Sequence, residues 1–170
     1  MTTDTLTANT VTIRPATDAD ADAVWTIFHA VVSAGDTYSF APDTPRAEAL
    51  RLWLEVPQAA FVAETEAGIA GTYYLKPNQP GLGDHVCNAG FMVAPSARRR
   101  GLGRALGEHA LATARALGFR AMVFNFVVST NTGAIALWES LGFAVAGRVP
   151  GAFRHAERGP TDTLVMHRVL

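Results

Sequence analysis

The sequence predicts a mixed α/β fold, an α+β arrangement in which one central pair of strands is parallel. Three observations carry this prediction. Short β-prone runs recur along the whole chain, amphipathic helical repeats separate them, and one nearly continuous apolar run, 119–128, follows a helix that itself follows a strand. A strand, helix, strand order implies a parallel pair, because such a crossover returns the chain in the same direction. With 170 residues, we expect a single domain over residues 11–170 behind a flexible tail of residues 1–10.

The first half of the chain predicts a strand, two helices and a hairpin. The stretch "VTIRPAT" at 11–17 alternates between apolar and polar residues, as a strand does. Residues 18–35 repeat apolar side chains at helical spacing behind several aspartates, which favour a helix N-terminus. The stretch 45–56 begins with proline and predicts a second helix. Residues 59–68 and 69–78 predict two antiparallel strands joined through a glycine turn.

The second half predicts the central parallel pair. Residues 85–95 form a strand whose Gly90 indicates either a bulge or a close backbone approach. A helix follows from about residue 103 and ends at Gly118, and the run 119–128 is typical of a strand covered on both faces. The remaining elements are a short helix and two closing strands, at 131–143, 144–150 and 161–170.

Composition excludes several classes of protein. A formal net charge of -1 argues against general nucleic-acid binding, which needs a broad basic face. No apolar run approaches the roughly 20 residues that span a membrane, and no basic region followed by an apolar stretch opens the chain. The one cysteine, Cys87, excludes an intramolecular disulfide and a cysteine-based metal cluster. We therefore expect a soluble cytoplasmic protein without a membrane partner or a metal.

A candidate anion site lies in "ARRRGLGRAL", residues 97–106, where a parallel sheet presents a helix N-terminus to ligands. The glycines let backbone amides approach an anion, and the helix dipole adds about half a positive charge. The spacing matches neither a Walker loop nor a dinucleotide fold, and a solvated arginine run is the alternative interpretation. The candidate pyrophosphate-binding residues are Arg98, Arg99, Arg100, Gly101, Leu102, Gly103 and Arg104.

The order of elements, the R-x-x-G-x-G spacing and the stretch "NTGAIALWESLGF" together resemble the GCN5-related N-acetyltransferase (GNAT) superfamily. The resemblance covers roughly residues 11–170. It implies the GNAT fold, an acyltransferase activity, acetyl-CoA as co-substrate, and a homodimer in which the closing strand 161–170 could serve as a shared edge.

The resemblance also assigns roles on the two central strands, which in that family splay to admit the pantetheine arm of acetyl-CoA. The strand that pairs with the arm contributes Phe91, Met92 and Val93. Asn131 reaches the same arm, and Trp138 packs against it or against the core. A backbone amide near Phe91 or Met92, freed by a bulge at Gly90, would donate to the thioester oxygen, which is worth on the order of 3 kcal/mol in the barrier.

Two of the usual acid and base groups of that family are absent. Where many relatives carry a glutamate, this chain has Asn88, and an amide takes up no proton at pH 7. An amine with a pKa of about 10 would lose its proton through a water relay, or to Asp84 or His85. Trp138 stands at the position of the family's tyrosine, so the thiolate, with a pKa of about 8.5, leaves unassisted or another group donates.

Several stretches, "GTYYLKPN", "CNAGF", "FNFVVSTN" and "LWESLGF", resemble a yeast branch of the family that acetylates the ring nitrogen of azetidine-2-carboxylate and other proline-like acids. The resemblance implies direct transfer, in a ternary complex, to a small amine, an amino acid or an imino acid. Asn88 and Asn125 could bind its carboxylate or ring nitrogen, Phe91 would form an apolar wall, and Tyr38 could close the pocket from a loop. Alternatively Tyr38 is a surface aromatic, and the two amides satisfy one another or the backbone.

Asn125 interrupts the apolar run 119–128, and an unpaired buried amide costs on the order of 1 to 3 kcal/mol. The fold or a ligand must therefore satisfy it. Two other functions stay open: acetylation of a peptide or protein amine, and a non-catalytic acyl-CoA sensor, which the missing glutamate and tyrosine favour.

Overall fold

The computed structural model describes residues 10–170, so the predicted tail, except for Thr10, lies outside the described residues. The chain forms a seven-stranded sheet in the order β1-β2-β3-β4-β5-β7-β6. Only β4 and β5 pair in parallel among these neighbours, which confirms the predicted mixed fold. The strands are β1 Thr12–Pro15, β2 Ala59–Thr65, β3 Gly68–Pro77, β4 Val86–Val93, β5 Ala121–Val128, β6 Ala144–His155 and β7 Gly159–Val169.

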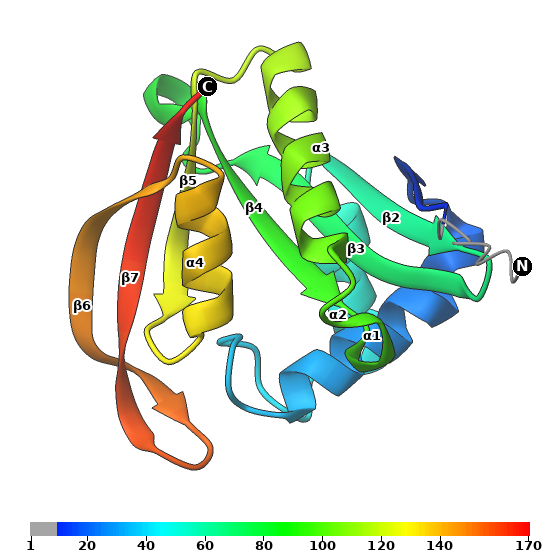
Figure 1. Cartoon of the computed structure of the whole chain (residues 1–170), viewed down its shortest axis with the longest axis horizontal. Helices are drawn as coiled ribbons and strands as arrows, with labels where there is room; N and C mark the ends of the chain where they lie inside the picture. Colours follow the sequence, from blue (N-terminus) through cyan, green and yellow to red (C-terminus); the bar gives the residue numbers. More distant parts are fainter. Residues whose placement is uncertain (1–9) are drawn as a thin grey trace, which may run out of the picture.

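Helices cover both faces of this sheet (Figure 1). The α-helices are α1 Ala21–Ser33, α2 Arg46–Leu50, α3 Leu102–Ala116 and α4 Thr132–Ser140. Short 3-10 turns stand at Asp18–Asp20, Gly81–Gly83 and Pro95–Ala97. Within residues 10–170 no helix combines the length and apolar character needed to cross a membrane.

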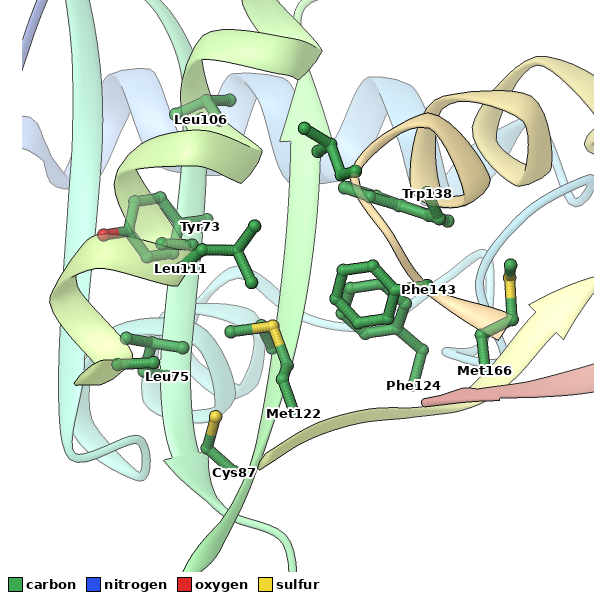
Figure 2. Close-up of a cluster of buried hydrophobic side chains, with 14 of the residues drawn as sticks. Tyr73, Leu75, Cys87, Leu106, Leu111, Met122, Phe124, Trp138, Phe143 and Met166 are labelled. Atoms are coloured by element: carbon green, nitrogen blue, oxygen red, sulfur yellow. The ribbon is translucent and has the colours of Figure 1, made fainter. Parts of the chain in front are cut away.

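The protein has two apolar cores, one on each face of the sheet. One lies under α3 and α4 and contains Tyr73, Phe124, Trp138 and Phe143 (Figure 2). The other packs α1 and α2 on the opposite face, around the fully buried Trp53. The apolar residues at helical spacing in α1 and α3 point inward, so the periodicity of the sequence decides which of their side chains enter each core.

Two elements differ in detail from the sequence prediction. The helix predicted over 45–56 is α-helical only to Leu50 and continues as a π-helical turn over Arg51–Glu55. This wider turn carries Trp53, whose indole N–H donates to the Thr72 hydroxyl at 3.0 Å. The strand predicted over 144–150 continues to His155, because β6 resumes its pairing with β7 after an irregularity.

The predicted bulge at Gly90 is wrong. Pairing between β3 and β4 runs without a register shift from Gly71 opposite Val93 to Pro77 opposite Cys87. The alternative interpretation, a close approach, is correct: a Cβ at Gly90 would lie 2.5 Å from Cε1 of Tyr74. The glycine therefore makes room for the Tyr74 ring on the face of α1 and α2.

The first strand is held to α1 by a nearly buried carboxylate. Both oxygens of Asp20 accept from the Arg14 guanidinium, at 2.8 and 2.9 Å, and one also accepts from the Thr17 amide at 2.8 Å. Arg14 in addition donates to the half-exposed Glu64. The bonds from Arg14 lower the pKa of Asp20 from 3.8 to about 2.

This pKa gives a stability prediction for Asp20→Asn. Because the pKa of the folded state lies below that of the unfolded state, the carboxylate contributes stability above pH 4 that is lost as the pH falls toward 2. We expect the substitution to lower the free energy of unfolding by about 2 kcal/mol at pH 7, with the difference shrinking below pH 4. Urea denaturation across this range measures it. Glu64→Gln, at the exposed partner, is the control and should cost under about 0.5 kcal/mol; an equal loss in both variants contradicts the assignment.

Candidate active site

The sheet opens between β4 and β5. The two strands pair only at Val86 with Ala121, Cys87 with Met122 and Asn88 with Val123, and Figure 1 shows them diverging beyond that point. The opening lies at the carboxyl ends of two parallel strands, and α3 and α4 begin just beyond those ends. In open α/β sheets this is the place where ligands bind.

Tyr38 fills the open edge of β4. Its hydroxyl accepts from the Phe91 amide at 2.8 Å and donates to the Phe91 carbonyl at 2.7 Å. The phenol comes from the loop between α1 and α2, and burial raises the pKa of Tyr38 well above its usual value. The expected donor, a free Phe91 amide exposed by a bulge, is therefore absent from this arrangement, because Tyr38 already accepts from it.

Asn88 closes the fork where the strands part. Its Nδ2 donates to the Val123 carbonyl at 3.0 Å, at the last paired position of the parallel ladder. The Tyr74 hydroxyl lies 3.4 Å from its Oδ1. Asn88 is thus largely satisfied within the fold, and its side chain replaces a ladder bond that the diverging strands cannot make.

Asn125 does not occupy a buried position, contrary to the expectation for the run 119–128. The residue is exposed, and its Nδ2 donates to Oδ1 of Asn78 at 2.6 Å. Asn88 and Asn125 do not bond to one another among the contacts of the described chain. Asn125 is exposed because β5 no longer pairs with β4 beyond Val123. The side chain of Asn125 therefore borders the cavity between the two strands.

Aromatic side chains line the opposite side of the opening. Trp138 of α4 packs with its ring centre 4.8 Å from those of Phe91 and Phe124, and Figure 2 shows Trp138 next to Phe124 and Phe143. Asn131 caps the same helix, because its Oδ1 accepts from the Ala134 amide. Trp138 therefore packs in the core and borders the cavity, while Asn131 stands at the mouth beside the N-terminus of α4.

These groups line a partly open cavity of about 230 Å³. Phe91, Phe124 and Trp138 border it on the face of α3 and α4, and Tyr74 and Asn88 on the face of α1 and α2. No Asp, Glu, His, Lys, Arg or Cys is among its lining residues in the described part of the chain. The nearby thiol offers no base, because burial raises the pKa of Cys87 to about 12.

The predicted anion loop stands exposed at the start of α3. Gly101 caps the helix in the left-handed conformation with φ of 75°, and Arg99 has a φ of 62°. The guanidiniums of Arg98, Arg99 and Arg100 have no hydrogen-bond or ion-pair partner within residues 10–170, whereas the Arg104 guanidinium donates to the Ser140 hydroxyl at 2.7 Å. Free guanidiniums beside the first amides of a helix of fifteen residues can hold a diphosphate.

Sequence reasoning missed the polar residues that β3 and its following turn contribute. Tyr74, Lys76 and Asn78 alternate in "GTYYLKPN", so a period of two places them on the face that carries Asn88. A second hollow, of about 390 Å³, lies between the β2–β3 turn and the anion loop, away from the open edge of β4.

The comparison with protein families identifies the chain. The model described as "Acetyltransferase (GNAT) family" matches residues 25–143. The chain belongs to the GNAT acetyltransferase family. The family-level resemblance of the sequence is confirmed.

Individual GNAT relatives match the chain to different extents. The N-acetyltransferase aca1 of Schizosaccharomyces pombe is 45% identical over 89 residues, which cover 52% of this chain and 43% of that protein. A GCN5-related N-acetyltransferase from Kribbella flavida is 46% identical with a TM-score of 0.89, over 94% of this chain and 98% of that one. A phosphinothricin acetyltransferase from Sinorhizobium meliloti, solved with AcCoA, is 27% identical with a TM-score of 0.85, over 95% and 89%.

The chain spans less than half the length of the curated relatives that it matches. The names of the three relatives above include no azetidine-2-carboxylate or other proline-like acceptor. Membership of the GNAT family thus supplies the class of reaction, and the acceptor has to be argued from the cavity.

The fit of Tyr74 over Gly90 gives a prediction for Gly90→Ala. The added methyl would lie 2.5 Å from Tyr74, whose ring is held edge-on against the buried Trp53 at 4.8 Å. We expect the free energy of unfolding to fall by about 1 to 3 kcal/mol in urea denaturation, as in other overpacked sites. Gly133→Ala in α4 is the matched control, because a methyl there meets nothing within 4 Å; it should be neutral or stabilising. Equal denaturation midpoints for the two variants would show that Tyr74 is free to move.

Proposed function

We propose that this enzyme transfers the acetyl group of acetyl-CoA to the nitrogen of a small amine, an amino acid or a proline-like imino acid, in a ternary complex. The observation that carries the proposal is the cavity of about 230 Å³ at the open edge of β4. It is smaller than the roughly 300 to 1,000 Å³ of pockets that hold drug-sized ligands. Its size therefore favours a compact acceptor over the extended chain of a protein.

The co-substrate would enter from the face of α3 and α4. The exposed arginines of the anion loop and the first amides of α3 would hold its pyrophosphate. The open edge of β4, from Phe91 to Val93, offers backbone groups to the pantetheine arm, and Asn131 stands beside that path. The relative from Sinorhizobium meliloti with bound AcCoA supports this choice of co-substrate.

In the proposed reaction the neutral amine attacks the thioester carbon. A C–N bond forms, the C–S bond breaks, and the amine proton leaves while the thiolate departs. The Phe91 amide is positioned to donate to the developing oxyanion once Tyr38 no longer occupies it, which is worth on the order of 3 kcal/mol. No carboxylate or imidazole is among the lining residues in the described part of the chain, and burial raises the pKa of the two lining phenols, Tyr38 and Tyr74. We therefore propose that water carries the amine proton.

The acceptor would lie on the face of α1 and α2, against Tyr74, Asn88 and Asn125. Asn88 keeps one N–H that makes no hydrogen bond within residues 10–170, and Asn125 is exposed to the cavity. Amides can both donate and accept, so they suit an acceptor that presents both an amine and a carboxylate. The resemblance of these strands to enzymes that acetylate proline-like acids supports the same class.

Thiol release from acetyl-CoA tests this proposal. The panel comprises amino acids, cyclic imino acids, polyamines and a lysine peptide, with identical enzyme and acetyl-CoA concentrations. We expect turnover on amino or imino acids and little on the peptide. Turnover on the peptide alone would contradict a small acceptor, and tight acetyl-CoA binding without turnover on any amine would favour a sensor, a function consistent with the uncharged lining.

The double contact of Tyr38 predicts competition with the co-substrate. In the proposed complex the pantetheine arm needs the Phe91 groups that Tyr38 occupies. Tyr38→Phe should therefore tighten acetyl-CoA binding by roughly thirtyfold, because two hydrogen bonds of about 1 kcal/mol each no longer stabilise the free form. Calorimetric Kd values measure this change.

The matched control for Tyr38→Phe is Tyr73→Phe. The Tyr73 hydroxyl bonds to His109 at 2.7 Å, and neither residue lines the cavity in the described part of the chain, so removal of this hydroxyl should leave acetyl-CoA affinity unchanged. Weaker acetyl-CoA binding by Tyr38→Phe would mean that the hydroxyl contacts the co-substrate instead of competing with it.

A further inference from the structure

Lys76 stands next to the acceptor side of the cavity. It lies two residues after Tyr74 on β3 and pairs directly with Asn88 on β4, so the three side chains share one face of the sheet. Tyr74 and Asn88 both line the cavity. The ammonium of Lys76 is 5.6 Å from the centre of the Tyr74 ring, which holds it beside the cavity rim.

The charge of Lys76 has no carboxylate counterion within residues 10–170. It is the one lysine in the sequence, and it is half-buried. The ion pairs within residues 10–170 all involve arginines, so no carboxylate there lies within 4 Å of this ammonium. An ammonium that faces an aromatic ring and no carboxylate can still bind an anion, and a hydrogen bond between two charged groups is among the stronger ones.

We infer that Lys76 binds the carboxylate of the acceptor and makes the enzyme selective for amines that carry a carboxylate close to the nitrogen. This inference rests on the proposed function. It names the substrate class more narrowly: α-amino acids and cyclic imino acids, as opposed to their amides, their esters and plain amines.

The surroundings suit a carboxylate at this position. Asn88 offers an N–H beside the cation, and the lining contains no acidic side chain that would repel an anion. In an α-amino or imino acid one carbon separates the amine from the carboxylate. An anion anchored at Lys76 and Asn88 therefore keeps the nitrogen near the fork, close to the open edge of β4.

The test compares L-proline with L-prolinamide, its neutral analogue, in the full-length enzyme. Lys76→Met keeps the apolar stem over Tyr74 and removes the charge. We expect kcat/KM for proline to fall roughly ten- to a hundredfold, the effect of losing one charge-assisted hydrogen bond, while kcat/KM for prolinamide stays within about threefold. For each substrate, kcat/KM of the variant is divided by kcat/KM of the wild type. This ratio cancels the different basicity of the two amines.

Two further variants separate charge from structure. Lys76→Arg keeps the cation and should retain the preference for proline over prolinamide. Arg115→Met removes the same charge from the exposed end of α3, on the opposite face, and should change neither substrate. An equal loss of both substrates in Lys76→Met, or a proline-specific loss in Arg115→Met, overturns the inference.

A binding measurement decides the inference independently of turnover. Proline is titrated calorimetrically into the complex of the enzyme with CoA, for wild type and Lys76→Met. Weaker binding of proline but not of prolinamide to the variant supports the inference, even if no amine is acetylated and the proposed function fails. Equal binding of proline to both proteins, or no binding to wild type at millimolar concentration, overturns it.

Discussion

The parallel ladder between β4 and β5 stops after three residue pairs, and the rest of the site depends on that interruption. A backbone amide and carbonyl that face an enclosed gap need partners, because an unpaired buried group costs on the order of 1 to 3 kcal/mol. At Phe91 the partner is a phenol from a loop 53 residues earlier in the chain. The interruption thus creates the cavity, recruits the loop and leaves an edge to which a ligand can pair.

Aromatic packing keeps the two strands apart beyond Val123, and a hydrogen bond joins them where the ladder ends. Under α4, the rings of Phe91, Phe124 and Trp138 meet at centre distances between 4.8 and 5.9 Å and act as a wedge across the gap. A register shift between Phe124 and Val127 lets β5 follow β7 instead of β4. At the fork, the Asn88 amide satisfies Val123 where the ladder ends. Because interiors are close-packed, such a gap persists only where side chains support its walls.

The sequence predicts those features whose cause is local. Apolar periodicity identifies the helices and strands, and the order strand, helix, strand identifies the parallel pair. The anion site in the glycine-containing arginine loop stays a prediction. Asn125 shows where such reasoning fails. An apolar run indicates a strand covered on both faces, but the run itself does not show that β4 stops pairing with β5 after Val123. The bond from Tyr38 to Phe91 likewise has no local signal, since it depends on how a distant loop closes.

Gly90 illustrates a second limit of prediction from the sequence, which concerns the role of a glycine inside a strand. A glycine inside a strand indicates either a bulge or a close approach, and the two alternatives differ only in what stands opposite. Here Tyr74 stands opposite, on the neighbouring strand, and its ring fills the space of the missing side chain. Cross-strand register decides between the two alternatives, and register is a property of the sheet as a whole.

An uncharged cavity with a cation at its rim has a chemical consequence for an amine acceptor. Desolvation disfavours the ammonium form, and a nearby positive charge disfavours it further, so both lower the pKa of a bound amine toward the reactive neutral form. Lys76 would supply that positive charge, which repels the protonated amine of the acceptor. Its attraction for the carboxylate of the same acceptor would offset this loss of affinity. Such an environment reduces the need for a strong base next to the nitrogen, which makes the absence of a carboxylate or imidazole from the described lining compatible with catalysis.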